Sequence, residues 1–320
     1  MTEATHRTVI TNGIRMHVAE QGAGPLVLLC HGFPESWYSW RHQLGDLAEV
    51  GFHALAPDLR GYGRTERPEA IDQYTLLRVV GDMVGLLDLL GAEEAVLAGH
   101  DWGAVVAWLA ALLRPDRFRG VIALSVPFRP GGGVRPTTLM PQTDDTIFYQ
   151  APVVAEADYE RDVRLTLGLI LYWHSGDASR RADNARPLHM VPRQGGVFTH
   201  ASNLPPLPAW LSETDLDFFA AEFGRTGFRG GLNWYRNIDR NWELLAPFAG
   251  ARVTVPALFL VGERDPVLAH PDMETAILNQ SALVPQLHGT IMLPGCGRWI
   301  QQERPDEVTA AMVDFIRGLT

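Results

Sequence analysis

The stretch GHDWG, Gly99–Gly103, decides the fold, because it places one carboxylate between two glycines at the end of an apolar run. The run before it is AVLAG, Ala95–Gly99, and the segment after it, Ala104–Leu113, has the small apolar residues of a packed helix. A strand that turns sharply into a helix needs glycines where a side chain would strain the backbone or block the approach of strand and helix. We therefore expect Asp101 to sit on a tight turn that holds its side chain up at the carboxyl edge of a sheet.

Strand and helix patterns alternate on both sides of this turn. Continuous apolar runs are typical of parallel strands that helices cover on both faces. The predicted strands are Pro25–Cys30, His53–Asp58, Ala95–Gly99, Val121–Val126, Val253–Gly262 and Gly289–Gly295, and the predicted helices are Trp40–Val50, Tyr74–Leu90, Ala104–Leu113 and Pro305–Gly318. Alternating segments on either side of Asn12 and Gly13 indicate an N-terminal hairpin. The pattern predicts an α/β fold with a mostly parallel sheet flanked by helices.

The alternation stops in the middle of the chain. Pro127–Pro141 is rich in proline and glycine, and the residues that follow, about 144–241, have a helical and aromatic pattern without a convincing buried strand. The strand pattern resumes at Val253. We expect residues 1–128 and 246–320 to form one sheet domain, and residues 129–245 to form an inserted helical cap.

The composition is that of an ordinary globular protein, with 46% hydrophobic and 20% charged residues among 320. A net charge of −10 argues against a nucleic-acid partner and against an anionic membrane surface. The chain has only Cys30 and Cys296, opens without a secretory signal, and has no apolar run long enough to span a membrane. We expect a cytoplasmic protein without a disulfide framework, for which a homodimer is a possible assembly.

The turn at Asp101 has the G-x-nucleophile-x-G form of the nucleophile elbow in the α/β-hydrolase fold. A carboxylate is already ionised at pH 7, so it can attack saturated carbon and form an alkyl-enzyme ester without a base to activate it. The loop HGFP, His31–Pro34, follows the first core strand, and in this fold that loop and the elbow each supply a backbone N–H to an oxyanion. These donors would be Phe33 and Trp102. A helix-capping aspartate and an ordinary proline turn are the alternatives.

A second acid, Asp265, lies in GERDPV, Gly262–Val267, directly after a strong strand pattern. The α/β-hydrolase fold places there the acid that orients a catalytic histidine. Asp-Pro is also a common turn pair, so the preceding strand is what favours a catalytic role.

Five motifs spread over nearly the whole chain resemble the epoxide hydrolases of the α/β-hydrolase fold. They are HGFPESWYSWRHQL, DLRGYGRT, GHDWGA, GGLNWYRNIDRNWE and GCG-WIQQERP. The resemblance implies addition of water to a small apolar or aromatic epoxide in two half-reactions, with no metal and no organic cofactor. It implies that Asp101 is the nucleophile and that Asp265 orients a base. It also implies that Tyr235 is a lid tyrosine that protonates the ring oxygen; an aromatic core residue of the cap is the alternative.

One departure from this resemblance concerns the base. The family pattern is GCGHW, whereas this chain has GCGRW, so Arg298 occupies the position of the catalytic histidine. Arginine has no acceptor atom and a pKa above about 12, so it cannot take a proton from water. We expect impaired hydrolysis of the ester and an ion-pair cluster of Arg298 with Asp101 and Asp265. The alternative is a substitution introduced to trap the ester.

A second departure lies in the first segment of the cap. The resemblance places another lid tyrosine eleven residues before the Glu of a V-A-E motif. Here VAE ends at Glu156, so counting back gives Asp145, and Tyr149 lies one helical turn further on. We expect Asp145, Tyr149 and the cap tryptophan Trp173 to line the substrate site. An acid at position 145 could also meet the guanidinium of Arg298.

Three histidines of the cap, His174, His189 and His200, could reach the pocket as a substitute base. Cap histidines more often lie at the surface or in packing contacts. No pair of histidines has the spacing of zinc ligands with a nearby carboxylate, so no metal site is expected.

Two other functions would use the same residues. A haloalkane-dehalogenase-like enzyme would combine Asp101 with Trp102 as a halide donor, but Phe33 disfavours it, because such enzymes usually place a second halide-binding side chain near that position. A non-catalytic binding protein would keep the pocket without turnover.

Overall fold

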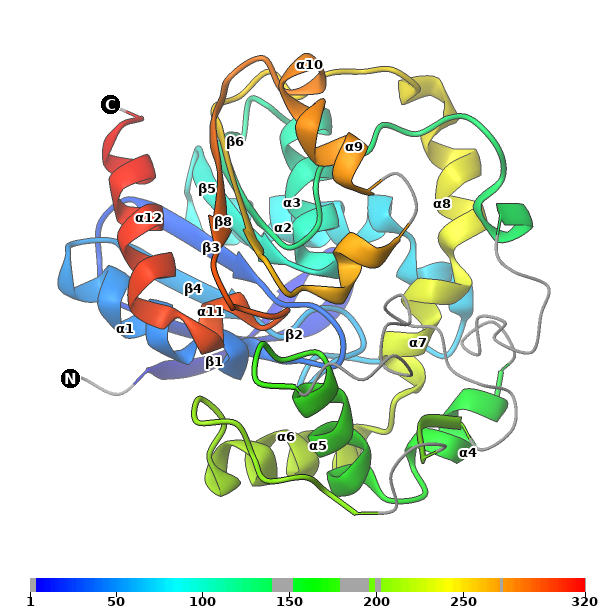
Figure 1. The fold of residues 1–320 in the computed structure, drawn as a ribbon. Helices are drawn as coiled ribbons and strands as arrows, with labels where there is room; N and C mark the ends of the chain where they lie inside the picture. Colours follow the sequence, from blue (N-terminus) through cyan, green and yellow to red (C-terminus); the bar gives the residue numbers. More distant parts are fainter. Residues whose placement is uncertain (1–3, 140–151, 179–195, 199–202, 271–272, 320) are drawn as a thin grey trace.

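The computed structural model describes residues 4–139, 152–178, 196–198, 203–270 and 273–319 (Figure 1). This described part contains a sheet of eight strands in the order β1-β2-β4-β3-β5-β6-β7-β8. The strands are β1 (Thr5–Thr11), β2 (Ile14–Gln21), β3 (Leu26–Cys30), β4 (His53–Pro57), β5 (Ala95–His100), β6 (Phe118–Leu124), β7 (Ala257–Gly262) and β8 (Leu287–Leu293). The pairs β1–β2 and β2–β4 are antiparallel, and the other pairs are parallel. The predicted α/β fold with a mostly parallel sheet is confirmed.

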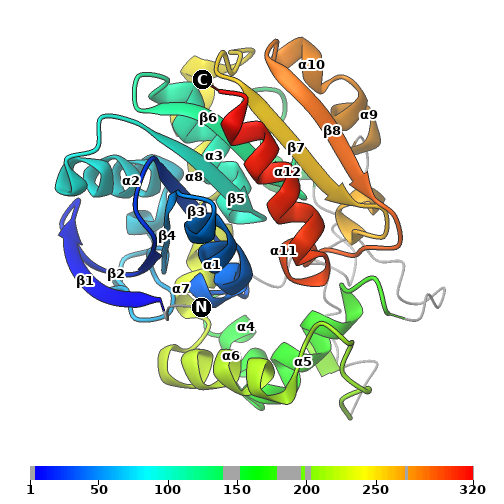
Figure 2. The same ribbon diagram turned by 90° about the vertical axis from the view of Figure 1, so that its left-hand side faces the viewer.

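Helices cover both faces of the sheet, because alternate residues of a strand point to opposite sides. The helices of the sheet domain are α1 (Arg41–Glu49), α2 (Leu76–Leu90), α3 (Trp102–Leu113), α9 (Met273–Leu278), α10 (Gln280–Leu283), α11 (Ile300–Glu303) and α12 (Pro305–Arg317). On β3, Leu28 and Cys30 join the core cluster that includes α2 and α3, whereas Val27 and Leu29 join the cluster under α1 and α12. Figures 1 and 2 show these two layers on opposite sides of the strands.

A helical insert lies between β6 and β7, as the cap prediction requires. Its helices are α4 (Val154–Tyr159), α5 (Val163–Trp173), α6 (Glu213–Thr226), α7 (Arg229–Arg236) and α8 (Ile238–Leu245). Short 3₁₀ turns occur at η1 (Trp37–Trp40), η2 (Ile71–Tyr74), η3 (Pro136–Leu139), η6 (Gly196–Phe198), η7 (Ala246–Phe248) and η8 (Pro266–Ala269). The cap bounds of 129 and 245 stay a prediction. Within the described residues, no helix is both long enough and apolar enough to cross a membrane.

Hydrogen bonds tie the insert to the sheet domain. The indole N–H of Trp234, on α7, donates to the carbonyl of Arg60 at 3.0 Å. In the other direction, the indole N–H of Trp299 donates to the carbonyl of Leu171, on α5, at 2.8 Å. Helices α4 to α7 therefore pack at the end of the sheet where the loops after the strands gather (Figure 1).

Several strand boundaries differ from the prediction, and two of them have a clear local cause. The pattern predicts a strand from Val253, but β7 begins at Ala257, because Pro256 has no N–H to donate to a neighbouring strand. The pattern also predicts a strand to Val126, but β6 ends at Leu124. The next residue, Ser125, has a φ of 71°, which takes the backbone out of the extended region.

The predicted strand-to-helix turn is present between β5 and α3. Asp101 has φ 56° and ψ −120°, a strained conformation for a residue with a side chain. A Cβ on Gly99 would lie 2.0 Å from the carbonyl oxygen of Gly103, and a Cβ on Gly103 would lie 2.0 Å from the carbonyl oxygen of Cys30. Both flanking glycines are therefore required for the strand and the helix to approach each other so closely.

Candidate active site

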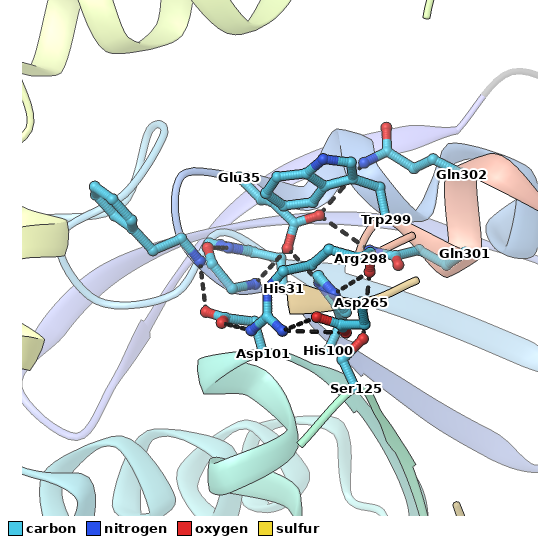
Figure 3. A network of polar contacts seen from close by, with 12 residues as sticks. His31, Glu35, His100, Asp101, Ser125, Asp265, Arg298, Trp299, Gln301 and Gln302 are labelled. Atoms are coloured by element: carbon cyan, nitrogen blue, oxygen red, sulfur yellow. Dashed lines mark hydrogen bonds and ion pairs between the residues drawn. The ribbon is translucent and has the colours of Figure 1, made fainter. Parts of the chain in front are cut away.

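Asp101 lies at the centre of the candidate site, 3% exposed and facing the loop after β3 (Figure 3). Its Oδ1 accepts a hydrogen bond from the backbone N–H of Phe33 at 3.0 Å. Trp102 is the first residue of α3, so its N–H belongs to the first turn, where N–H groups have no acceptor within the helix. The structure thus brings Phe33, Trp102 and the carboxylate of Asp101 to one point at the carboxyl end of β5.

Arg298 reaches this point from the loop after β8, and its side chain is 1% exposed. Its Nη1 lies 3.1 Å from Oδ1 and 3.2 Å from Oδ2 of Asp265, and its Nη2 contacts Oδ2 of Asp101 (Figure 3). Burial alone would lower the pKa of this guanidinium, but the charges of Asp265 and Asp101 outweigh burial and raise its pKa above the ordinary value. The ion-pair cluster expected from the sequence is present, and it holds one cation between two carboxylates.

The second carboxylate is held by backbone as well as by charge. Asp265 follows β7 directly and is 3% exposed. Its Oδ1 accepts a hydrogen bond from the N–H of Val267 at 2.8 Å, which caps the short turn η8. The expected turn-forming role of Asp265 and its contact with residue 298 are therefore both present in the same side chain.

Tyr235 comes to the site from the cap. It lies on α7 and is 4% exposed. Its ring packs edge-on against Phe33 at 5.5 Å and against Trp102 at 5.1 Å, measured between ring centroids. The next residue, Arg236, forms two hydrogen bonds of 2.8 and 2.9 Å with the carboxylate of Glu156, which fixes α7 against α4. Tyr235 is thus placed over the two residues whose N–H groups are expected to bind an oxyanion.

Sequence reasoning did not single out a second buried pair, Glu35 and His100. The Oε2 of Glu35 lies 2.6 Å from Nδ1 of His100, and the Nε2 of His100 lies 2.9 Å from the carbonyl oxygen of Arg298. Both ring nitrogens of His100 therefore face an oxygen atom. Burial alone would raise the pKa of Glu35, but His100 outweighs burial and lowers it.

This pair positions the loop that carries Arg298. Glu35 lies in the motif HGFPESW and His100 lies in GHDWG. An acid and a histidine in these two motifs were the signal from which the pair could have been predicted. Oε1 of Glu35 also accepts a hydrogen bond from Gln301 at 3.0 Å. Ser125 adds a hydroxyl that donates to the carbonyl of Arg298 at 3.3 Å.

The remaining expected site residues belong to the insert between β6 and β7. Asp145, Tyr149, His189 and His200 lie outside the described residues. Trp173, the last residue of α5, is partly exposed and packs edge-on against Tyr172 at 4.9 Å. Among the described contacts, none joins Trp173 to the ion-pair cluster.

Comparisons with known proteins identify the family of this chain. A family model described as the alpha/beta hydrolase fold matches residues 25–305. Epoxide hydrolase A of Mycobacterium tuberculosis is 45% identical over 327 residues, which cover 100% of this chain and 99% of that protein. Epoxide hydrolase 2 of Siraitia grosvenorii is 43% identical, with 99% of each chain covered.

Solved structures give the same result at the level of the fold. An epoxide hydrolase from an endophytic Streptomyces superposes with a TM-score of 0.94 at 46% identity, covering 100% of this chain and 97% of that one. An epoxide hydrolase from Vigna radiata superposes with a TM-score of 0.90 at 41% identity, covering 99% of each chain. Both superpositions span nearly the whole of this chain. The chain belongs to the epoxide hydrolase family of the α/β-hydrolase fold.

Proposed function

We propose that this protein opens a small apolar or aromatic epoxide by attack of Asp101 on a ring carbon, and that Arg298 makes hydrolysis of the resulting ester slow. The observation that carries the proposal is the buried guanidinium of Arg298 between Asp101 and Asp265. The guanidinium of Arg298 bears on both half-reactions. Its charge acts on the nucleophile, and it occupies the position expected of a base.

In the first half-reaction, one oxygen of Asp101 bonds to a ring carbon while the ring C–O bond breaks. A carboxylate beside a guanidinium stays ionised, which a nucleophile requires. The hydroxyl of Tyr235 supplies a proton to the ring oxygen. Esterification removes one negative charge and leaves Arg298 and Asp265 as a neutral buried pair, so the cluster tolerates the covalent intermediate.

In the second half-reaction, water must attack the ester carbonyl and lose a proton. The N–H group of Phe33, which donates to Oδ1 of Asp101, and that of Trp102 would stabilise the charge that develops on the carbonyl oxygen. Arg298 has five donors and no acceptor, so it cannot take that proton. A missing general base costs about 10²–10⁴-fold in rate, and the ester should therefore accumulate.

The substrate class follows from the rings around the nucleophile. Beside Asp101, Tyr235 packs against both Phe33 and Trp102, and Trp234 lies 5.9 Å from Trp102 between ring centroids. Aromatic walls bind apolar and aromatic groups and leave few polar groups to orient the reacting ring. Styrene oxide is therefore a suitable first probe.

The test is intact-mass spectrometry of the protein after incubation with styrene oxide. We expect an adduct with the mass of one epoxide, located on Asp101 by peptide mapping, and little free diol. The adduct should be missing from the Asp101→Asn variant. Free diol at rates typical of an efficient hydrolase, with no adduct, would contradict the proposal.

A second variant separates a blocked base from a damaged site. Arg298→His restores an acceptor beside Asp265, so we expect diol formation to rise by about 10²-fold and the adduct to disappear. Arg298→Lys, which keeps a cation and supplies no base at neutral pH, is the matched control and should not gain diol formation. Equal behaviour of the two variants would mean that Arg298 does not limit hydrolysis.

A further inference from the structure

The turn after α5 packs directly on the loop that carries Arg298. The backbone N–H of Arg298 donates to the carbonyl of His174 at 2.8 Å. A Cβ on Gly297 would lie 2.2 Å from the backbone nitrogen of Gly176 and 2.6 Å from the carbonyl oxygen of His174. The two backbones are thus in contact, and His174 is a fixed neighbour of Arg298.

Glu303 locks this contact from the other side. Its Oε2 accepts hydrogen bonds from the N–H groups of Gly176 at 2.9 Å and Gly297 at 2.8 Å, and its Oε1 accepts one from Trp299 at 3.0 Å. One carboxylate therefore holds the cap turn and the loop together, and the position of His174 does not depend on the cap alone.

Two buried polar atoms in this contact lack partners among the described residues. They are Nδ1 of His174 and Nε of Arg298. The first can accept a hydrogen bond in a neutral imidazole, and the second can only donate one. The charges of Arg298 and Asp101 both act on the imidazole of His174, so the ring lies within electrostatic range of the cluster. A donor and an acceptor of this kind match the needs of one water molecule.

The other histidines described around the cluster are already occupied. His31 accepts from the N–H of Leu59 through Nε2 at 3.0 Å, and its Nδ1 faces the carbonyl of Gly32 at 2.8 Å. His100 is bonded at both nitrogens, as described above. Of these three histidines, His174 is the one with an acceptor nitrogen available.

We infer that His174 is the proton acceptor for the water that hydrolyses the Asp101 ester, and that the Nε–H of Arg298 binds the oxygen of that water. The inference rests on the proposed ester intermediate. It assigns a base to a site whose sequence has arginine where a base is expected, and it gives Arg298 a positioning role.

The oxygen of water bonds to the carbonyl carbon of the Asp101 ester while one proton of water passes to Nδ1 of His174. The bond from that carbon to the alkyl oxygen then breaks, and His174 returns the proton to the alkyl oxygen, which leaves as the diol. Asp101 is left as a carboxylic acid, and the proton it releases restores the hydroxyl of Tyr235.

The electrostatic surroundings make His174 a weak base. Burial, and next the charge of Arg298, lower the pKa of His174 to about 3, against an opposing effect of Asp101. Esterification removes the charge of Asp101, so the pKa falls further in the intermediate. His174 therefore stays neutral above pH 5 and can accept a proton, but its low basicity makes the transfer slow.

The test is a single-turnover experiment with styrene oxide. Intact-mass spectrometry of quenched samples follows the formation and decay of the Asp101 adduct. We expect His174→Ala and His174→Gln to form the adduct at the rate of the unchanged protein and to lose it at least about 10-fold more slowly. The control His288→Gln, at an exposed position on β8, should change neither rate. Added imidazole should partly restore decay in His174→Ala.

The pH profile gives an independent readout. With His174 as the base, the decay rate should be flat between pH 5 and 9, whereas a base with the ordinary histidine pKa of about 6.5 would give a rise across pH 5.5–7.5. Decay that is equal in the unchanged protein and in both His174 variants would overturn the inference alone. A protein that never forms the adduct would overturn the proposed function and, with it, this inference.

Discussion

At the scale of single residues, the chemistry of this site depends on one guanidinium. Arg298 forms ion pairs with two buried carboxylates, Asp101 and Asp265, which would otherwise repel each other. A buried ion pair gives little net stability when complete, but loss of one partner leaves a charge that neither water nor protein compensates. Stability and reactivity are therefore coupled at this position.

We expect Asp265→Asn to destabilise the fold by about 2 kcal/mol, because its charge-assisted contacts with Nη1 of Arg298 would become weaker neutral hydrogen bonds in a site that excludes water. Urea unfolding at pH 7 measures this change. Asp314→Asn, at an exposed position on α12, makes the same substitution and should stay within about 0.5 kcal/mol of the unchanged protein. A loss below about 1 kcal/mol for Asp265→Asn would show that the cluster does not depend on this carboxylate.

At the scale of elements, the contact between the cap turn and the loop after β8 is made by backbone atoms. Gly297 allows this contact, because residues 174–176 lie where its side chain would be. The sequence GCG shows two glycines here, but it does not show that only the second faces another segment. Gly295 has open space around a Cβ and instead has a positive φ of 68°.

We expect Gly297→Ala to separate the loop from the cap turn and to lower the free energy of unfolding by at least about 2 kcal/mol, because the colliding atoms are backbone. Thermal unfolding followed by circular dichroism measures the effect. Gly289→Ala, on β8, meets no atom within 4 Å and is the matched control, with little expected change. If both variants have the same melting temperature, the contact between the loop and the cap turn accommodates a Cβ at position 297.

At the scale of the whole molecule, one buried network joins segments that are far apart in the chain. Glu35 follows β3, His100 ends β5, and Gln301 lies on α11, yet all three meet in hydrogen bonds under the ion-pair cluster. The pKa of Glu35 is lowered, so its ionised form contributes stability that is present above about pH 4.5 and is lost as the pH falls through the lower folded-state pKa.

We therefore expect Glu35→Gln to lower the free energy of unfolding by about 2–4 kcal/mol at pH 7. The loss should become progressively smaller below about pH 4.5, where Glu35 of the unfolded chain takes up a proton. Urea titrations at several pH values compare the two proteins. Glu93→Gln, at an exposed position before β5, should show no such convergence. A cost for Glu35→Gln that is equal at pH 7 and pH 3.5 would mean that the carboxyl acts through its shape and not its charge.

Much of this fold could be predicted from local pattern. Six runs predicted strands β3 to β8, and the wholly buried strands β3 and β7 have the continuous apolar pattern of strands covered on both faces. The glycines of GHDWG predicted the turn that presents Asp101, because close approach of strand and helix leaves no room for a Cβ. Strand boundaries were less predictable. Pro256 precedes the start of β7, and Ser125 follows the end of β6, and both act through backbone geometry.

The sequence by itself determined the sheet, the elbow, the presence of an insert and the identity of the charged groups, because these follow from residue type and from contacts between near neighbours in the chain. Only the tertiary structure decided that the guanidinium of Arg298 turns inward between two carboxylates. It also decided that Glu35 pairs with His100, and that the turn at His174 packs against the loop that carries Arg298. These contacts join residues 33 to 197 positions apart, and their strength comes from the exclusion of water, which no local pattern records.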